Sequence, residues 1–286
     1  MMKYLDAMNG QDRIEKKIGN HGFVALVDVM PRLVPEGSTA DYAVVQAARV
    51  SYGDGTKTPS DDRTLIRYLM RHRHTTPFEM VEMKFHVSLP MFIARQWIRH
   101  RTANVNEYSA RYSLVPDSFW KPDQTRAQGT TTKQTGEGFA GADAEDMLLK
   151  SLDKAEALYS DYESLIASGV CREQARAILP VSAYTQWYWK CDLHNIFHFL
   201  SLRMDKHAQQ EIRDYALAMF DMVKMVFPIS SEAFEDYRLE TVSLTRLEIE
   251  ALKNKSKNIN SSNKRESEEW KRKLATLGLD DGDYLS

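Results

Sequence analysis

The chain reads RHRTANVNEYSARYS at residues 99–113, directly after the apolar, amphipathic stretch LPMFIARQWI. Three arginines, Arg99, Arg101 and Arg111, lie within thirteen positions of this segment. Their guanidinium groups can donate paired hydrogen bonds to a phosphate or polarise a carbonyl. Glu107 is the one fixed negative charge among them. A surface loop does not need so many donors, so we expect the segment to hold an anionic ligand rich in hydrogen-bond acceptors.

The stretch before this segment predicts a helix that Pro90 opens. Gln96 and Arg99 are three residues apart and would share one face of such a helix. Arg99 and Arg101 would diverge if the helix continued, so we expect it to end near His100. Two of its residues occur at the spacing typical of core packing: Trp97 and Ile98.

The segments upstream predict strands and helices in turn. FVALVDVM at 23–30 and MVEMKFHVSL at 80–89 are rich in β-forming residues and predict strands. Between them, TADYAVVQAARVSY at 39–52 and SDDRTLIRYLMRHR at 60–73 predict helices. The expected N-cap residues are Ser38 or Thr39 for the first helix and Ser60 for the second.

The downstream half is mainly helical. Residues 121–145 are polar and rich in Gly and Thr, which predicts a flexible insertion. The pattern predicts a strand at 183–190 and helices at 144–168, 172–179, 194–204 and 207–227. The tail alternates charges in a helical pattern and lacks a wide apolar face. We therefore expect one domain over 1–240 and a charged helical extension over 241–286.

The composition is that of an ordinary enzyme, with 286 residues, 43% hydrophobic residues and a formal net charge of -2. This near-neutral charge argues against nucleic-acid binding, because no basic field is present to displace counterions. Two cysteines, Cys171 and Cys191, are too few for a disulfide framework or a four-thiolate zinc site. No apolar run of about 18 residues occurs, and the N-terminal stretch MMKYLDAMNGQDR is polar. We expect no membrane span, no signal peptide and a cytoplasmic location.

The polar residues of the opening segment follow a known spacing. Arg99-His100-Arg101, seven further residues and Ser109-Ala110-Arg111 fill the signature RHR-x7-S-x-R. In this motif the chain resembles the flavin-dependent thymidylate synthases. The similarity continues through the blocks HTTPFEM, FIARQWIRHR, NEYSARYS, REQARAILP and FLSLRMDKHAQQEI, which occur in that order over roughly residues 22–225.

The resemblance implies an α+β fold, with helices packed on a small, mostly antiparallel sheet. It implies a single-domain subunit of a homotetramer whose active sites lie at subunit interfaces. The implied reaction converts dUMP to dTMP by methylating carbon 5 of the uracil ring. The carbon would come from 5,10-methylenetetrahydrofolate and the hydride from FAD that NADPH has reduced. Neither cysteine lies in the motif, which suits a mechanism without a thiolate nucleophile.

For the nucleotide, the resemblance implies a binding set that centres on the motif: Gln96, Trp97, Ile98, Arg99, Glu107, Tyr108, Ser109, Ala110, Arg111, Arg176 and Arg203. Forked guanidinium donors suit a dianionic phosphate, so Arg111 and Arg176 are assigned mainly to that group. Arg203, in the block FLSLR, resembles the family's activating arginine, which lies against the pyrimidine edge. A fixed cation there would stabilise the charge left as N3 loses its proton, so Arg203 is the predicted catalytic residue.

For FAD, the resemblance implies contacts from a partly overlapping set: His74, Thr76, Arg99, His100, Arg101, Glu107, Asp192, Leu193, His194 and His198. No GxGxxG motif occurs, so a Rossmann turn is not expected to hold the flavin. The chain departs from the family pattern at Asn104, where many members have serine. It also departs at 192–198, where DLHNIFH replaces a stretch rich in asparagine and arginine.

Several of these assignments have alternatives that the residues alone leave open. Arg176 can simply pair with Glu173 on its own helix. Ser109 can be a helix cap, and no base is evident that would activate it as a nucleophile. His100 can be a structural hydrogen-bonding residue instead of a flavin contact.

Two other functions are compatible with part of the sequence. A metal-dependent hydrolase would use the histidines of an H-x-H pair and of a helical i, i+4 pair: His72, His74, His194 and His198. No HExxH motif is present, however, and the nearby arginines would repel a cation. An RNA-binding module would stack bases on Tyr108 and Tyr112, which the near-neutral net charge disfavours.

Overall fold

The computed structural model describes residues 2–4, 13–51, 61–130 and 135–280. The chain forms two compact units, Met1–Glu235 and Asp236–Ser286. All the residues predicted for the nucleotide and flavin sites belong to the first unit.

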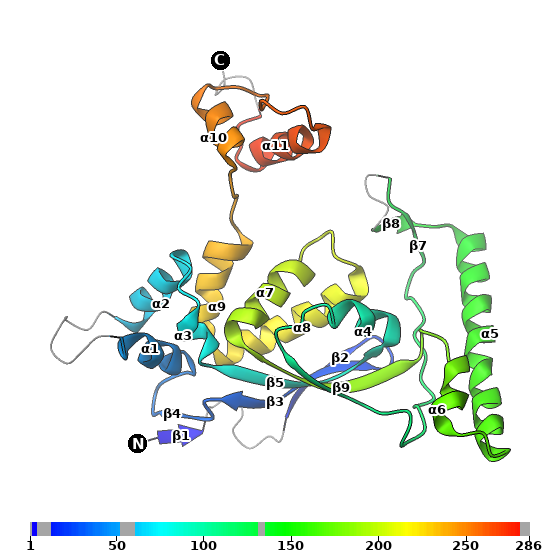
Figure 1. The fold of residues 1–286 in the computed structure, drawn as a ribbon. Helices are drawn as coiled ribbons and strands as arrows, with labels where there is room; N and C mark the ends of the chain where they lie inside the picture. The colour runs from blue at the N-terminus through cyan, green and yellow to red at the C-terminus, as the bar shows by residue number, and fades with distance from the viewer. Residues whose placement is uncertain (1, 5–12, 52–60, 131–134, 281–286) are drawn as a thin grey trace. The chain divides into compact units, whose positions relative to one another are not determined.

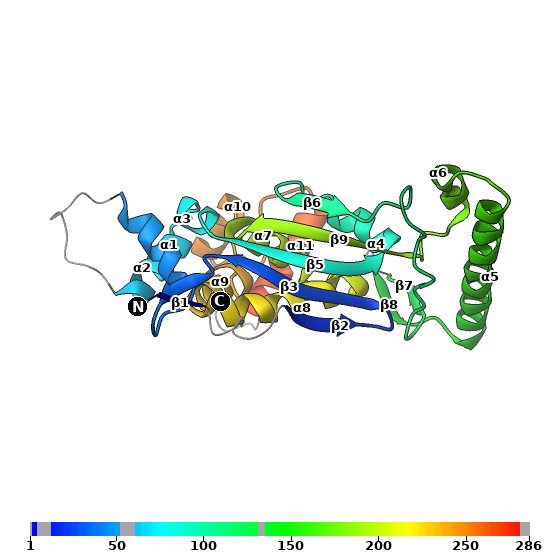
Figure 2. The same cartoon turned by 90° about the horizontal axis from the view of Figure 1, so that it is seen from below.

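The first unit is built on a five-stranded antiparallel sheet (Figures 1 and 2). Its strand order is β2-β3-β5-β9-β6, with the bounds Ile14–Ile18, Gly22–Met30, Glu82–Pro90, Tyr184–Asp192 and Asn104–Glu107. Two small antiparallel pairs also occur: β1 (Met2–Tyr4) with β4 (Leu33–Pro35), and β7 (Arg126–Gln128) with β8 (Gly136–Phe139). The strands predicted at 23–30, 80–89 and 183–190 are confirmed as β3, β5 and β9. The α+β class with a mostly antiparallel sheet is confirmed as well.

Helices pack against one face of this sheet: α4 lies against β5 and β9, α7 against β9, and α8 against β2 and β3, with α8 also contacting α4 and α7 (Figures 1 and 2). The helices of the first unit are α1 (Asp41–Arg49), α2 (Asp62–Arg71), α3 (Thr76–Glu79), α4 (Met91–Trp97), α5 (Ala142–Ala167), α6 (Arg172–Ala175), the 3₁₀ turn η2 (Arg176–Ile178), α7 (Leu193–Arg203), α8 (Gln210–Val226) and α9 (Pro228–Phe234). A π-helical turn, η3 (Glu235–Leu239), follows α9 at the junction with the second unit.

The core lies between these helices and the sheet. Alternate residues of β5 and β9 face the helices and are buried, as the two-residue period of a strand requires. Trp97 of α4 is fully buried at the centre of this layer, where its ring stacks on Phe199 with centroids 4.5 Å apart. The rings of Trp187 and Trp189 on β9 meet it edge-on, each at 5.7 Å. The predicted core role of Trp97 is confirmed, and this packing fixes α4 against the sheet.

Helix α1 begins without the predicted cap. Its N-cap residue is Ala40, no side chain caps it, and the Thr39 hydroxyl donates to Asp41 instead. Asp41 is buried and accepts hydrogen bonds from the backbone N–H groups of Ile229 and Ser230, at 3.0 and 2.9 Å. The carboxylate of α1 therefore caps the distant helix α9, and the prediction that Ser38 or Thr39 would cap α1 is wrong.

Two other local predictions differ from the structure. The predicted cap of α2, Ser60, lies outside the described residues, and the N-cap is Asp61, which accepts from the Thr64 N–H at 3.2 Å. The stretch 121–145 is not a plain loop, because it contains the β7–β8 pair and the start of α5. An ion pair between Arg126 of β7 and Glu211 of α8, at 2.5 Å, ties this hairpin to the helical layer.

The second unit is a pair of helices with a small core of its own. It contains α10 (Arg246–Lys253) and α11 (Lys264–Thr276), and its buried residues are Ala251, Ile259, Trp270 and Leu274. The second unit therefore has few buried apolar residues, and the largest of them is Trp270. Among the described residues of the whole chain, no helix combines the length and the hydropathy needed to cross a bilayer.

Candidate active site

The opening segment of the sequence begins where α4 ends. Ile98 is the C-cap residue, and the next turn is held by a bond from the His100 N–H to the Trp97 carbonyl oxygen at 2.9 Å. The chain turns here because it must reach strand β6, which pairs with β9. Arg99 therefore lies beyond the helix, and the expectation that Gln96 and Arg99 share a helical face is wrong.

Side chains from this turn and from the end of α7 meet in what we call the His100–Arg203 pair. The Nε of Arg203 donates to the Nε2 of His100 at 2.9 Å, although the two residues are 103 positions apart. Burial, then the charge of Arg203 and then that of His198, lowers the pKa of His100 to about 4. The imidazole is therefore neutral at neutral pH and can accept this hydrogen bond. Burial also lowers the pKa of Arg203.

The two arginines that flank His100 are exposed. Neither Arg99 nor Arg101 forms a hydrogen bond or ion pair with any other residue in the described part of the chain. Nearby in sequence, the side-chain oxygen of Gln96 is buried without a hydrogen-bond partner among the described residues, which is uncommon in folded proteins. The two unpaired cations suit an anionic group such as the predicted FAD, whereas the unsatisfied amide oxygen of Gln96 needs a hydrogen-bond donor from a ligand.

The carboxylate of Glu107 is held by a residue that sequence reasoning missed. Glu107 stands on β6 opposite Trp187 of β9, and its Oε1 accepts from the Thr185 hydroxyl at 2.8 Å. Thr185 is buried, so this hydroxyl orients the carboxylate from inside the sheet. The alternating pattern of AYTQWYWK puts Thr185 on the same strand face as Trp187, but only the β6–β9 pairing brings it to Glu107.

The residues after Glu107 form a turn that is stabilised by hydrogen bonds within the same segment. Tyr108 donates from its hydroxyl to the Leu114 carbonyl oxygen at 2.5 Å, and the Ser109 hydroxyl accepts from the Arg111 N–H at 3.4 Å. Ala110 is buried in a small cluster with Tyr162 of α5. In the single chain, Ala110 and Trp97 therefore offer a ligand little or no surface, since they are 8% and 0% exposed.

The two arginines predicted to bind phosphate lie beside one acidic residue. Arg111 pairs with the Glu173 carboxylate through its Nε at 3.4 Å, and the Nε of Arg176 donates to the Glu173 carbonyl oxygen at 3.3 Å. Arg111 and Arg176 are both exposed. We call these three residues the Arg111 cluster. The alternative in which the Arg176 side chain pairs with the Glu173 side chain is wrong for the described residues, because Arg176 bonds to the Glu173 backbone and the Glu173 carboxylate pairs with Arg111.

Predicted flavin residues at the other end of the sheet lie where α2 meets α3. The His74 N–H donates to the Leu69 carbonyl oxygen at 2.9 Å, and its ring stacks on Tyr68 with centroids 5.8 Å apart. Thr76 is the first residue of α3 and is exposed. Both side chains can therefore reach a ligand at this edge.

The four residues predicted from the stretch 192–198 have different environments. Asp192 caps α7, its two carboxylate oxygens accepting from the backbone and side-chain nitrogens of Asn195 at 2.9 and 2.8 Å. Leu193 is fully buried. His194 is half-buried and His198 is exposed, with the His198 ring 5.9 Å from that of His100. Of these four residues, His198 is the one whose ring meets the His100–Arg203 pair.

One chain does not gather all the predicted residues into one place. Helix α6, which carries Glu173 of the Arg111 cluster, lies at one end of the sheet, and α3 lies at the other, with α7 between them (Figures 1 and 2). Strand β9 alone spans nine residues between these ends, or about 27 Å at the usual rise of a strand. The Arg111 cluster and the flavin residues near α3, His74 and Thr76, are therefore separated along the sheet in one chain.

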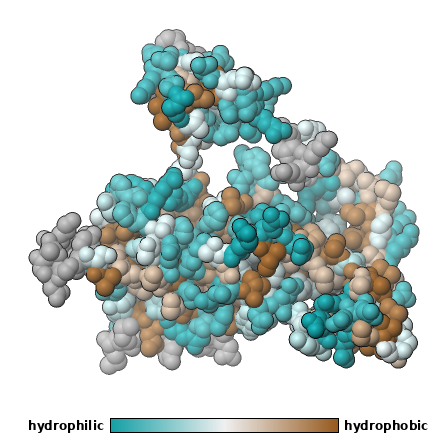
Figure 3. Space-filling view, viewed as in Figure 1, coloured by the Kyte–Doolittle hydropathy of each residue, from teal (hydrophilic) through white to brown (hydrophobic). Residues whose placement is uncertain are grey.

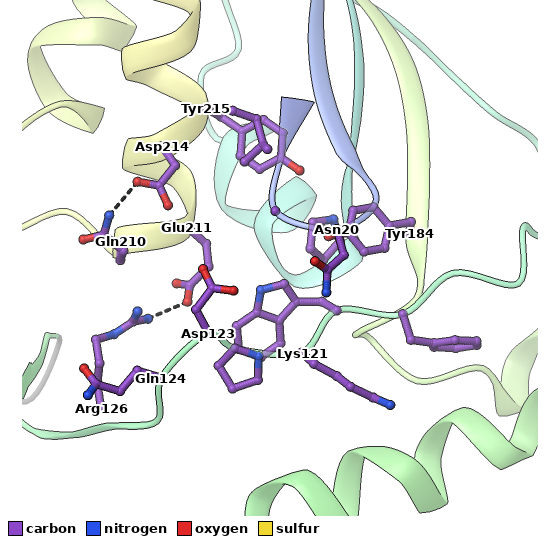
Figure 4. Close-up of a pocket in the computed structure, with 16 residues that line it drawn as sticks. Asn20, Lys121, Asp123, Gln124, Arg126, Tyr184, Gln210, Glu211, Asp214 and Tyr215 are labelled. Carbon is purple, nitrogen blue, oxygen red and sulfur yellow. Dashed lines mark hydrogen bonds and ion pairs between the residues drawn. The ribbon is translucent and has the colours of Figure 1, made fainter. Parts of the chain in front are cut away.

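A cavity of about 330 Å³ lies elsewhere, at the start of α8, and none of the predicted site residues lines it. Figure 4 shows Asn20 and Asp123 extending toward its middle from opposite sides. Two of its other residues are engaged in contacts that the figure marks: Glu211 with Arg126, and Asp214 with Gln210. The lining carries three carboxylates, those of Asp123, Glu211 and Asp214. It also carries two cations, Lys121 and Arg126, but both already pair with carboxylates, which makes the cavity a poor site for a nucleotide phosphate.

The described cysteines and histidines do not support a metal site. Cys191 is buried, donates to the Thr102 carbonyl oxygen at 3.1 Å, and has its pKa raised by burial. Cys171 is exposed at the N-cap of α6. Over the described residues, no three or more His, Cys, Asp and Glu side chains are grouped to hold a metal ion. The metal-hydrolase hypothesis therefore has no support here.

Comparisons with known proteins agree on one family. The model of the family described as "Thymidylate synthase complementing protein" matches residues 32–229. A flavin-dependent thymidylate synthase of Dictyostelium discoideum is 56% identical over 278 residues, which is 96% of this chain and 91% of that protein. Another from Thermus thermophilus is 52% identical over 232 residues, covering 81% of this chain and 82% of that protein.

A solved structure is similar as well. A UMP/dUMP methylase, PolB from Streptomyces cacaoi, bound with 5-Br UMP, has a TM-score of 0.67 and 37% identity to this chain. The match covers 78% of this chain and 98% of the methylase. The family model covers the β4–α9 region, and both the RHR-x7-S-x-R motif and the His100–Arg203 pair lie within it. The chain therefore belongs to the family of flavin-dependent thymidylate synthases, and it is a flavin-dependent methyltransferase that forms thymidylate.

Proposed function

We propose that this enzyme methylates carbon 5 of the uracil ring of dUMP, with 5,10-methylenetetrahydrofolate as the carbon donor and NADPH as the source of electrons. The observation that carries the proposal is the His100–Arg203 pair beside two arginines, Arg99 and Arg101, that no described residue pairs with. Bound FAD would supply the hydride that converts the transferred methylene into a methyl group. The similar methylase PolB, whose structures hold 5-Br UMP and 5-Br dUMP, supports a uridylate as the substrate.

The proposed division of roles follows the chemistry of each group. Arg203 lies against the pyrimidine edge and stabilises the anionic ring by hydrogen bonds from a fixed cation. Arg111 and Arg176 bind the phosphate, helped by Gln96 and by the Ser109 turn. The remaining nucleotide contacts are assigned to Trp97, Ile98, Arg99, Glu107, Tyr108 and Ala110.

For FAD, Arg99, His100 and Arg101 form the centre of the proposed site. Glu107, His194, His198, His74 and Thr76 complete its polar side chains, while Asp192 and Leu193 contribute through the start of α7. The cations bind the pyrophosphate and favour negative charge on the ring system. Because the Arg111 cluster of the same chain lies at the other end of the sheet from α3, we propose that a complete site takes residues from more than one subunit.

We also propose that the enzyme is a homotetramer whose active sites lie between subunits. The separation of the Arg111 cluster from α3 supports this arrangement, because a neighbouring chain can bring the two ends together. Apolar side chains gather at the α5–α6 end of the first unit in Figure 3. Tyr112 and Val181 remain 76% and 65% exposed in the single chain, which suits a covered surface in an assembly. A cytoplasmic location is proposed from the absence of a disulfide framework among two cysteines.

The visible spectrum of the purified protein tests the cofactor assignments. We expect flavin absorption near about 450 nm that is released on denaturation and bleached by NADPH. Incubation with dUMP, NADPH and methylenetetrahydrofolate should then yield dTMP in proportion to bound flavin. A protein that takes up FAD and forms dTMP without NADPH or the folate would contradict the proposed co-substrates, and a colourless protein carrying stoichiometric zinc would contradict the whole proposal.

A further inference from the structure

His100 is placed to control how Arg203 presents its charge. His100 is held at its backbone and at its ring: its backbone N–H bonds to the Trp97 carbonyl oxygen, its ring packs edge-on against Phe199 with centroids 4.9 Å apart, and its Nε2 accepts from Arg203. Phe199 and Arg203 are one helical turn apart on α7. The histidine therefore holds one face of α7 at the point where the helix ends.

The bond to His100 uses one particular nitrogen of the guanidinium. It engages Nε, and within the described residues Arg203 has no other hydrogen-bond or ion-pair partner. The two terminal nitrogens, with the remaining four of the five N–H donors of an arginine, are left for a ligand. Two of these N–H groups point in parallel from the end of the fork, a geometry that matches two adjacent acceptors in one plane.

Such an acceptor pair exists on the uracil ring once N3 has lost its proton to solvent, since N3 then lies between two carbonyl oxygens as a third acceptor. A neutral ring instead offers an N–H donor at N3, which a guanidinium cannot accept. An arginine that approaches end-on therefore prefers the anionic ring, whereas an arginine that is free to rotate loses much of this preference. The orientation of the Arg203 guanidinium therefore determines how strongly it favours the anionic ring over the neutral one.

We propose that His100 is a positioning residue that accepts from the Nε of Arg203 and thereby turns the terminal edge of the guanidinium toward N3 of the pyrimidine. This inference rests on the proposed function, in which Arg203 meets the uracil ring. The role requires Nε2 to be free of a proton, so the neutral ring carries its proton on Nδ1. No described residue accepts from Nδ1, which leaves that N–H available to a flavin acceptor.

The surroundings keep His100 an effective acceptor. Burial is the largest cause that lowers the pKa of His100 to about 4, and the charges of Arg203 and His198, both on α7, lower it further. Arg99 and Arg101 flank His100 in sequence, and both are exposed. The acceptor is therefore present over the whole neutral range and is lost only in acid.

The test compares three variants with the wild type, with FAD added in excess and rates expressed per bound flavin. His100→Phe keeps a flat ring but removes the acceptor, and His100→Leu serves where phenylalanine does not fit. His100→Gln keeps an acceptor at a similar reach. His207→Gln is the matched control, since His207 bonds to Asp205 in an exposed turn outside the proposed site.

We expect His100→Phe to lower kcat about 100-fold, the usual consequence of misplacing a catalytic group by about 1 Å, with the KM for dUMP changed only a few-fold. His100→Gln should recover kcat to within about tenfold of the wild type, because it restores the acceptor. The control should match the wild type.

A second readout separates positioning from a purely structural role. Bromine at carbon 5 withdraws electrons and makes N3 more acidic, so the ratio of the dissociation constants of dUMP and 5-bromo-dUMP reports how strongly the site favours the anionic ring. We expect this ratio to fall in His100→Phe and to return in His100→Gln. In a structural role, the phenylalanine and glutamine variants would weaken both nucleotides together and leave the ratio unchanged, which would overturn the proposal. Wild-type kcat and ratio in His100→Phe would overturn it as well.

Arg203→Ala distinguishes this inference from the proposed function. If Arg203→Ala keeps the wild-type kcat and ratio, the role given to Arg203 fails, and the role of His100 fails with it. If Arg203→Ala loses both while His100→Phe keeps both, the inference about His100 alone is wrong.

Discussion

Arg73 is the residue that ends helix α2, and it occupies a conformation that normally belongs to glycine. Its φ is 61°, in the left-handed region. The Arg73 N–H donates to Met70 and the His74 N–H to Leu69, at 3.3 and 2.9 Å, which is the bonding pattern of a Schellman motif. The motif stops α2 immediately before His74, so the path of the chain at this predicted flavin residue depends on a strained backbone.

We expect Arg73→Gly to stabilise the protein. Relief of left-handed strain is worth about 1–2 kcal/mol, and the greater freedom of glycine in the unfolded chain offsets about 0.5–1 kcal/mol of it. The net gain in the free energy of unfolding should be about 0.5–1 kcal/mol, measured by urea denaturation. Arg73→Ala is the control, because it removes the same side chain and retains the strain. A glycine variant no more stable than the alanine variant would show that the turn is unstrained.

A second prediction concerns Arg111, because both side chains of its ion pair with Glu173 are exposed to solvent. The side chains of Arg111 and Glu173 are 54% and 61% exposed, so the pair contributes little to stability. Arg111→Ala should change the free energy of unfolding by less than about 0.5 kcal/mol, yet raise the dissociation constant of dUMP about 10- to 100-fold. Calorimetric titration with dUMP gives both the affinity and the number of sites.

Glu173→Gln sharpens that test. The carboxylate competes with a phosphate for Arg111, so its removal should tighten dUMP binding about two- to fivefold. An unchanged dUMP affinity in Arg111→Ala would rule out the phosphate assignment of Arg111. Weaker binding in Glu173→Gln would instead give the glutamate a direct role in nucleotide binding.

The sequence suggested individual candidate residues, but it did not show which of them contact one another. The RHR-x7-S-x-R spacing pointed to the turn after α4, because local spacing survives folding unchanged. The bond between His100 and Arg203 could not be predicted from spacing, since 103 positions separate them and only the packing of α7 on the sheet brings them together. The Thr185 contact to Glu107 was hidden for the same reason, because it depends on which strand pairs with β6.

Among the elements, buried strands were predictable and edge strands were not. β3, β5 and β9 are rich in large apolar residues, and their alternation shows in the sequence. β6 (NVNE) was missed because it is a short edge strand in which all four residues are exposed. The β7–β8 hairpin was missed because Gly and Thr carry no apolar period there. The order of the strands could not be predicted from the sequence either, because β5 pairs with β9, and a long stretch of chain separates the two strands.

The second unit shows how a charged helix pair can fold with few apolar residues. Its α10 begins with a capping box, in which Thr245 and Glu248 exchange hydrogen bonds. The ammonium of Lys273 on α11 donates to both oxygens of Glu248, at 2.9 and 3.0 Å, and the Glu248 side chain is 4% exposed. One carboxylate therefore caps one helix and binds the other, next to the buried Trp270. The Dictyostelium match covers 96% of the chain and so includes most of this unit, whereas the PolB match covers 78%.

This arrangement predicts that the second unit is sensitive to acid. Burial acts to raise the pKa of Glu248, but the bonds from the Thr245 N–H and Lys273 outweigh it and hold the pKa below the ordinary value of 4.5. A carboxyl with a depressed folded pKa contributes stability above its unfolded pKa and loses it as the pH falls through the folded value. The unit should therefore lose stability as the pH drops below about 4.5. Amide hydrogen exchange of α10 and α11, corrected for the intrinsic rate at each pH, measures this loss.

Glu248→Gln is the control for that experiment, because an amide cannot titrate. The variant should be less stable at neutral pH and show a flatter dependence on pH in the acid range. If the wild type and Glu248→Gln lose protection in parallel as the pH falls, another group governs the acid response of this unit.

At the scale of the whole molecule, the arrangement of the first unit decides how a complete site can form. The Arg111 cluster stands at the α6 end of the sheet, Arg203 at the end of α7, and His74 at the α3 end. If each site takes its phosphate arginines from one subunit and Arg203 from another, two defective chains can repair each other. This complementation is a property of the assembly and not of any single residue.

The mixed assembly can be made by co-expressing Arg111→Glu and Arg203→Ala chains with different affinity tags and purifying over both. Each variant alone should have very low kcat/KM for dUMP, because every site lacks one of the two groups. With random assembly, both groups are intact in about one site in four, so the mixture should recover about a quarter of the wild-type kcat/KM. Subunits that build each site from a single chain would leave the mixture as inactive as its parents, since no site could then combine an intact Arg111 with an intact Arg203.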